Sequence, residues 1–179
     1  NLYTATVYEK GAEIIRMLRE IIGDTAFFAG LNRYFDQQDG NAATIEDFLN
    51  AFKPSTDFDL DRFARWYSQP GTPTVQATGE YEAISKTYRL TLTQTTPPTP
   101  NQTDKQPQVL PIRIALFSSN GQQLETVLNG KSAAEHLLVL GEASHEFVFE
   151  KVASTPIHSL NRNFSAAIKL EDGLNDASR

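Results

Sequence analysis

Apolar residues recur at helical spacing over the first 70 residues of the chain. The spacing predicts a helix from about Thr4 to Ile22, ended by Gly23, which suits a left-handed cap. A second helix is expected from Asp24, which can cap it, to Asp39. The residues expected to face inward are Val7, Gly11, Ile14, Ile15, Leu18, Ile21 and Ile22 in the first helix, and Phe27, Phe28, Leu31, Tyr34 and Phe35 in the second.

Two shorter helices are predicted next. Thr44 followed by Asp47 resembles a capping box, which opens a helix that Pro54 ends. A fourth helix starts near Asp59 or Leu60. Their inward residues are Ile45, Phe48, Leu49 and Phe52, then Leu60, Phe63, Trp66 and Tyr67.

From Thr74 the apolar period changes to two, which is typical of strands. Thr95 to Pro107 is rich in proline and polar residues and reads as a loop, and Asn120-Gly121 predicts a hairpin with a type I′ turn. Strands are expected around 75–79 and 88–92, and over 110–117, 123–128, 136–140, 145–152 and 163–170.

These patterns predict an α+β chain, in which about four helices precede an all-β immunoglobulin-like sandwich. The expected boundaries are 1–71 for the helices and 72–172 for the sandwich, with a frayed polar tail at 173–179.

The net charge of -6 and the absence of a basic cluster argue against partners with phosphate surfaces, such as nucleic acid or an anionic membrane. No apolar run approaches the ~18 residues of a membrane span. The chain has no cysteine, so it has neither disulfides nor thiolate metal ligands. It begins with Asn1, and its single methionine lies inside a predicted helix, so we expect a piece of a longer protein.

The candidate chemistry in the residues themselves is sparse. The three histidines fall in the β half, and the segment from His145 to Phe149 begins like H-E-x-x-H but ends in phenylalanine. The acidic run Asp57, Asp59 and Asp61 lacks the glycine and distal glutamate of a calcium loop and suits a helix start instead. The residues alone therefore predict no complete active site.

Tyr3 and Tyr8 lie at the start of the first predicted helix. They are either aromatic anchors of a buried helix or hydrogen-bond donors in an active site, and spacing alone favours the first reading without excluding the second. Gly11, inside the same apolar pattern, predicts a close packing contact, because a helical glycine costs about 1 kcal/mol relative to alanine.

Four segments together resemble the bacterial aminopeptidase N family, which are zinc aminopeptidases of the gluzincin class. They are the opening run 1–16 with Tyr-Glu-Lys-Gly-Ala, the run 65–73 with Trp-x-x-Gln-x-Gly-x-Pro, Lys105-Gln-Pro107, and the run 164–170. The resemblance covers nearly the whole chain. It implies the end of a thermolysin-like catalytic domain up to about Gly71, followed by the family's small β-sandwich.

The resemblance also implies roles for both tyrosines. Tyr8 matches the tyrosine that donates its phenolic hydrogen to the oxyanion formed when zinc-activated water attacks the peptide carbonyl, and Tyr3 matches a tyrosine that lines the substrate pocket. The zinc ligands, the general base and the segment that recognises the free amino terminus have no counterpart here. We therefore expect zinc in the parent enzyme, and neither zinc binding nor peptide hydrolysis by these residues alone.

The parent is expected to remove N-terminal residues from peptides in the bacterial cytoplasm, as part of peptide catabolism. Its remaining partners would be the N-terminal, catalytic and C-terminal domains of the same chain, between which the sandwich serves as a spacer. Two alternatives stay open: a separate sandwich module that binds a partner beneath a helical cap, and an inactive homologue used as a scaffold. If the catalytic core is missing, the apolar faces that carry Phe27, Phe28, Phe48 and Trp66 should lack partners.

Overall fold

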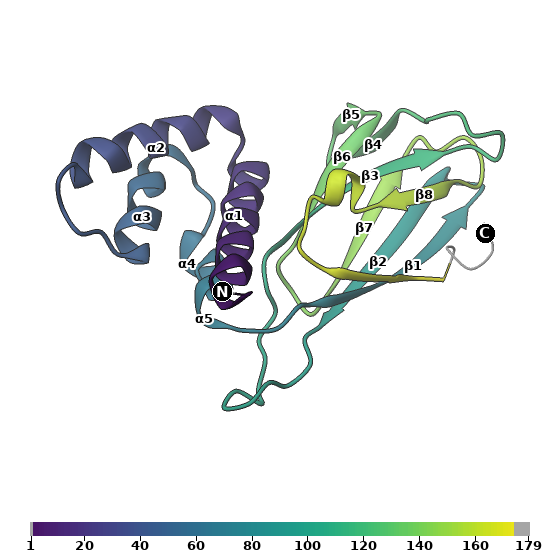
Figure 1. The fold of residues 1–179 in the computed structure, drawn as a ribbon. Coiled ribbons are helices and arrows are strands. Elements are labelled where there is room, and N and C mark those ends of the chain that lie inside the picture. Colours follow the sequence, from purple (N-terminus) through teal and green to yellow (C-terminus); the bar gives the residue numbers. More distant parts are fainter. Residues whose placement is uncertain (1, 174–179) are drawn as a thin grey trace. The chain divides into compact units, whose positions relative to one another are not determined.

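The structure, a computed structural model, describes the backbone of residues 2–173 and the side chains of residues 7–173 (Figure 1). The chain divides into two compact units, Asn1–Pro70 and Gly71–Arg179. The first unit is helical and the second is built of strands, which confirms the α+β prediction.

The helical unit contains two long helices and several short ones. They are α1 (Leu2–Ile22), α2 (Asp24–Gln38), α3 (Ile45–Phe52), a 3₁₀ turn (Lys53–Ser55), α4 (Leu60–Phe63) and α5 (Arg65–Ser68). The predicted fourth helix is therefore two short helices joined at Ala64.

The junction between α1 and α2 depends on Gly23. Its φ of 83° is left-handed, and its N–H donates to the carbonyl of Arg19 at 2.9 Å, which confirms the predicted cap. The prediction that Asp24 caps α2 is wrong. Asp24 is the first residue of α2, and its carboxylate accepts a hydrogen bond from Arg19 Nε at 2.7 Å instead.

Side-chain caps open both α3 and α4 as predicted. Thr44 Oγ1 accepts from the N–H of Asp47 at 3.1 Å, and the Asp47 carboxylate accepts from the N–H of Thr44 at 2.9 Å. Asp59 accepts from the N–H groups of Asp61 and Arg62, so this acidic run is a helix start.

An aromatic cluster forms the contact between α2 and α3. Phe27 of α2 stacks on Phe52 of α3 with ring centroids 5.5 Å apart, and Phe48 meets both Phe52 and Tyr34 edge to face. Gly30 gives the Phe52 ring room, because a Cβ at that position would overlap it. The close contact predicted at Gly11 is wrong, since a Cβ there meets no heavy atom of the described residues within 4 Å.

Part of the predicted inward faces is exposed. Phe27 and Trp66 are 6% and 3% exposed, so the expectation that they lack partners is wrong. Phe28 is 46% exposed, as expected. Exposed large side chains that periodicity placed inward are Val7, Ile15, Phe28, Phe35 and Ile45.

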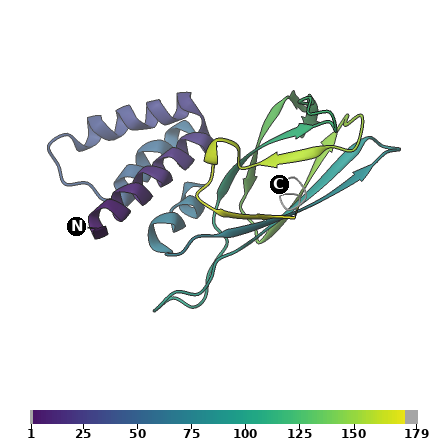
Figure 2. The same ribbon diagram turned by 45° about the vertical axis from the view of Figure 1, so that its right-hand side comes forward.

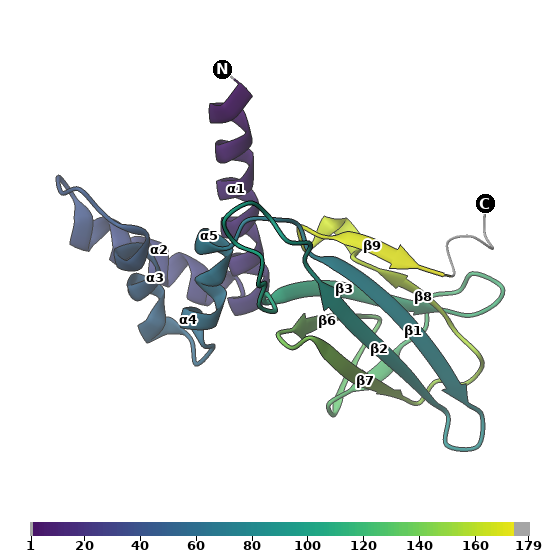
Figure 3. The same ribbon diagram turned by 90° about the horizontal axis from the view of Figure 1, so that it is seen from below.

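Over its described residues, 71–173, the second unit contains nine strands in two sheets. They are β1 (Thr74–Glu82), β2 (Thr87–Thr95), β3 (Leu110–Phe117), β4 (Thr126–Leu128), β5 (Lys131–Ala133), β6 (Glu135–Leu140), β7 (Ser144–Glu150), β8 (Ile157–Leu160) and β9 (Lys169–Asp172). One sheet has the order β5-β4-β7-β2-β1-β9 and the other β6-β3-β8. Figure 3 shows β7, β2 and β1 side by side in the larger sheet.

Alternation along β2 determines which side chains enter the sandwich. Tyr88, Leu90 and Leu92 are at most 4% exposed, as predicted. The three-stranded sheet contributes Ile112, Ile114 and Leu116 of β3 to the core of the sandwich. Between these strands the predicted polar loop extends away from both sheets (Figure 2), closed at its tip by a bridge between Thr99 and Gln102.

Several turns and strands differ from the prediction. Asn120-Gly121 does not form a type I′ turn: only Gly121 has a positive φ, of 84°, and its N–H donates to the carbonyl of Ser118. The strand expected over 163–170 starts later than predicted: residues Arg162–Phe164 form a 3₁₀ turn, and the strand, β9, runs from Lys169 to Asp172. Strands β5 and β8 were not predicted.

The last described strand of the sandwich is β9. Asp172, the predicted last residue of the sandwich, is also the last residue of β9 and pairs with Ala77 of β1. The predicted tail beyond Gly173 lies outside the described residues.

Candidate functional site

Tyr8 lies on the second turn of α1 with its side chain 76% exposed. On a helix, Gly11, Ala12 and Ile15 follow it on the same face. Ile15 is 39% exposed. The buried stripe of α1 lies beside this face and consists of Ile14, Met17 and Leu18. The fold therefore leaves the Tyr8 phenol accessible and does not use it as a core anchor.

Tyr3 belongs to α1, but its side chain lies outside the described residues. Glu9 and Lys10, which complete the motif around Tyr8, are both exposed. The structure thus brings no second described side chain of the predicted site into contact with Tyr8, and what remains is one accessible phenol on a helix.

A zinc ion does not fit the side chains between residues 7 and 173. Among them, no group of three or more His, Cys, Asp or Glu side chains is placed to hold a metal. The segment that begins like H-E-x-x-H lies on β7, where the His145 ring stacks on Phe147 with centroids 4.2 Å apart. No catalytic step can therefore be derived through a metal bound by these residues.

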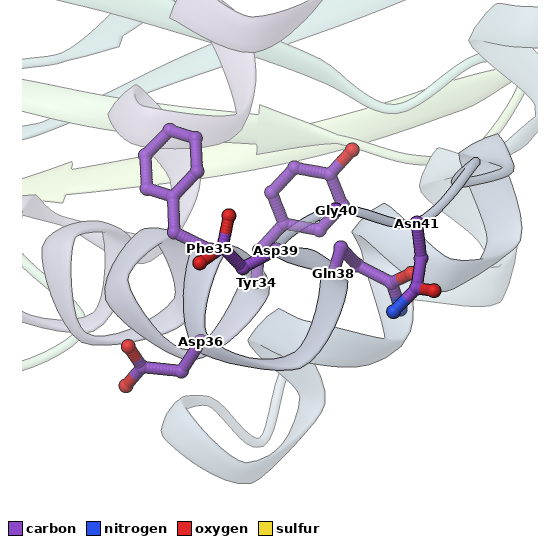
Figure 4. A pocket seen from close by; sticks show the side chains of 7 residues that line it. All are labelled: Tyr34, Phe35, Asp36, Gln38, Asp39, Gly40 and Asn41. Carbon is purple, nitrogen blue, oxygen red and sulfur yellow. The ribbon is translucent and has the colours of Figure 1, made fainter.

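A hollow of about 590 Å³ lies at the carboxyl end of α2 (Figure 4). In Figure 4 the rings of Tyr34 and Phe35 rise on one side, and the carboxylate of Asp36 points away from them. Its lining residues are Tyr34, Phe35, Asp36, Gln38, Asp39, Gly40 and Asn41. All of them come from the end of α2 and the turn that follows it, and the sequence offered no signal for this hollow.

A smaller cavity of about 250 Å³ lies beside the polar loop after β2, next to Gln94, Lys105 and Pro107. The Gln94 side chain exchanges two hydrogen bonds with the backbone of Gln108, at 2.8 and 2.9 Å. Lys105 Nζ donates to Gln102 Oε1 at 2.9 Å, within the same loop. These polar groups hold the loop in place, so the Lys105-Gln-Pro107 segment has a structural role here.

Two family models match the chain one after the other. Residues 71–173 match the domain of unknown function DUF3458, described as an Ig-like fold. The chain belongs to the DUF3458 family. Residues 1–67 match the peptidase family M1 domain, so the DUF3458 sandwich follows an M1 segment that contains Tyr8.

Curated relatives of this DUF3458 chain carry the same pair of segments in one protein. It is 42% identical to aminopeptidase N of Escherichia coli (strain K12) over 171 residues, which are 96% of this chain and 20% of the relative. The aminopeptidase N of Haemophilus influenzae gives the same values. That of Caulobacter vibrioides is 40% identical over all 179 residues, again 20% of the relative. The resemblance to bacterial aminopeptidase N is thereby confirmed.

A solved structure shares the fold of this DUF3458 chain. The crystal structure of Legionella pneumophila aminopeptidase A in complex with aspartic acid superposes with a TM-score of 0.79 and 32% sequence identity. The match covers 95% of this chain and 18% of the Legionella chain. This chain thus spans about one fifth of the length of these aminopeptidases.

None of the helices among residues 2–173 is long and apolar enough to cross a bilayer.

Proposed function

We propose that this chain is part of a zinc aminopeptidase that removes single residues from the amino termini of peptides. The observation that carries the proposal is the match of residues 1–67 to the M1 peptidase domain, together with the exposed phenol of Tyr8 on the helix that this match includes. The same match supports the enzyme over a separate binding module.

In the proposed enzyme, Tyr8 stabilises the oxyanion that forms when water attacks the scissile carbonyl. A phenol is protonated at neutral pH and can donate its hydrogen to a developing negative charge. Such a donor contributes about 2.7–4 kcal/mol to the transition state, or about 10²–10³ in kcat. Tyr3, one and a half turns earlier on α1, lines the pocket for the first substrate residue.

Zinc, the general base and the groups that bind the free amine belong to the larger part of the parent, outside the fifth that this chain matches. Zinc would supply the Lewis acid for the reaction. The sandwich acts as a spacer between the catalytic domain and a C-terminal domain, and the parent works on peptides in the bacterial cytoplasm. Fractionation of the source cells tests the last point.

The Tyr8 assignment is tested in the intact enzyme with Tyr8→Phe. We expect kcat for an aminoacyl-anilide to fall about 10²–10³-fold with little change in KM, because the lost hydrogen bond forms in the transition state. Tyr81→Phe is a matched control, since it removes a phenol that donates to the carbonyl of Val152 inside the sandwich. An unchanged kcat in Tyr8→Phe would remove Tyr8 from the mechanism.

A second experiment tests the division of labour within the chain. The purified 179-residue chain should not hydrolyse aminoacyl-anilides, with or without added zinc. Hydrolysis that a chelator abolishes would contradict this. A spacer without a site of its own also predicts that short peptides leave the amide resonances of residues 71–173 unchanged.

A further inference from the structure

Three buried polar side chains form a hydrogen-bonded chain inside the sandwich. Tyr88 Oη lies 2.6 Å from His158 Nδ1, and His158 Nε2 lies 2.8 Å from Asp172 Oδ2. The Tyr88 residue is 4% exposed, and the side chains of His158 and Asp172 are 1% and 5% exposed. The three residues come from β2, β8 and β9, so the chain links the six-stranded sheet to the three-stranded one.

The chemistry of the three groups determines where the protons lie. An ionised Asp172 only accepts, so His158 Nε2 carries a hydrogen and donates it. In a neutral imidazole the other nitrogen is then an acceptor, and Tyr88 donates to His158 Nδ1. Because the His158 side chain is buried, a substrate cannot reach these three hydrogen-bonded side chains, and they serve the fold.

The Tyr88 hydroxyl lies against β1 at Gly79, in space that a side chain on that strand would fill. A Cβ on Gly79 of β1 would overlap the Tyr88 hydroxyl and come within 2.9 Å of Cε2 of its ring. Tyr88 therefore occupies space that only a glycine on the neighbouring strand provides. The phenol is held where His158 can accept its hydrogen.

The register of β9 is tied to side-chain hydrogen bonds, among them the buried one between His158 and Asp172 and the exposed one from Gln76 to Glu171. β9 has four residues and pairs in parallel with β1, from Thr74 opposite Lys169 to Ala77 opposite Asp172. Lys169 and Glu171 are exposed, and Leu170 is its one apolar side chain. A shift by one residue would turn the strand over and place Glu171 or Gly173 at the inward position.

We propose that the hydrogen bonds of Tyr88, His158 and Asp172 act as a register lock for β9. They form only in the register that brings the Asp172 carboxylate to the imidazole of His158. In some proteins buried polar groups contribute more to the choice of one arrangement than to net stability, because desolvation offsets the attraction between them. The lock is a property of the sandwich and does not rest on the proposed enzymatic activity.

The proton arrangement is tested first in the unaltered 179-residue chain. A long-range ¹H–¹⁵N spectrum of the His158 ring should show hydrogen on Nε2 and a bare, hydrogen-bonded Nδ1 at neutral pH. A ring with hydrogen on Nδ1 alone would overturn the proposal, because His158 could then not donate to Asp172.

The register role is tested with two replacements of the same ring. Glutamine in His158→Gln can accept from Tyr88 and donate to Asp172, whereas leucine in His158→Leu can do neither. The reporter is the amide of Lys169, which donates to the carbonyl of Pro73 at 2.9 Å and exchanges slowly only when β9 is in place. We expect at least tenfold faster exchange in His158→Leu than in His158→Gln.

Glu171→Gln is the matched control, because Glu171 faces outward on the same strand and accepts from Gln76 Nε2 at 3.1 Å. It should leave Lys169 exchange within twofold of the unaltered chain. Equal Lys169 protection in His158→Leu and His158→Gln would overturn the register lock. So would faster exchange in His158→Gln than in His158→Leu, since packing would then outweigh the hydrogen bonds.

Discussion

A Cβ atom on Gly30 would come within 2.8 Å of Cε1 of Phe52, whose ring is fully buried. Carbon atoms that are not bonded to each other prefer about 3.5–4.0 Å. The contact between α2 and α3 therefore depends on the absence of a side chain at position 30, and a buried ring has no free space into which to retreat.

We expect Gly30→Ala to lower the free energy of unfolding of the helical unit by about 1–3 kcal/mol, since overpacking outweighs the higher helix propensity of alanine. Trp66 is the only tryptophan and lies in this unit, so its fluorescence in urea reports the transition. Gly11→Ala is the matched control. It meets open space and should raise stability by about 1 kcal/mol. Similar effects at both positions would contradict the close contact at Gly30.

These two glycines show how far the sequence predicts the helical unit. Periodicity finds the helices, because side chains on one face recur every three to four residues. It placed the close contact at Gly11, however, and the contact lies at Gly30. A glycine in an apolar pattern indicates a close approach only if another helix crosses at that point, and the crossing point is a tertiary property.

The capping box of α3 gives a prediction with a pH dependence. Thr44→Ala should lower stability by about 1 kcal/mol near neutral pH, because the N–H of Asp47 loses its acceptor. Thr44→Ser keeps that acceptor and should change stability little. Urea unfolding followed by Trp66 fluorescence measures both variants, and an equal loss in the two would show that the hydroxyl does not act as a cap.

The same box should weaken in acid. The backbone hydrogen bond from Thr44, followed by its side-chain bond, lowers the pKa of Asp47. A carboxyl with a depressed pKa contributes stability that is present above its unfolded value, about 4, and lost as pH falls through the folded value. Asp47→Asn should therefore flatten the decline below about pH 4. A decline of unchanged slope in Asp47→Asn would exclude this contribution.

In the sandwich, the sequence predicts which faces of β2 and β3 are buried but not what lies between the sheets. Alternation assigns Tyr88 inward, and the structure agrees. Nothing local indicates that Tyr88, His158 and Asp172 meet, because they are separated by 70 and 14 residues. Helical spacing likewise does not predict that Tyr8 is accessible, since it favours a buried aromatic anchor. The role proposed for Tyr8 comes from the family resemblance.

Tyr88 should resist ionisation when the folded sandwich is brought to alkaline pH. Burial, with a smaller effect from Asp172, raises the pKa of Tyr88 to about 12. Because an unfolded tyrosine titrates near 10, the folded state favours the neutral phenol, and this stability is complete below pH 10 and lost as pH approaches 12. Tyr88→Phe should lose that alkaline decline, whereas Tyr81→Phe should keep it. Spectrophotometric titration and urea unfolding from pH 9 to 12 compare the two variants.

His136 should make the sandwich less stable in mild acid. Burial is the largest effect and lowers the pKa of His136, although a hydrogen bond with Thr126 partly opposes it. The unfolded chain then takes up the proton first, so stability is complete above about pH 6.5 and declines as pH falls below it. Urea unfolding of the sandwich, followed by tyrosine fluorescence between pH 8 and 5, should show a shallower decline in His136→Gln. Equal slopes in the unaltered chain and His136→Gln would show that His136 is free to take up a proton in the folded state.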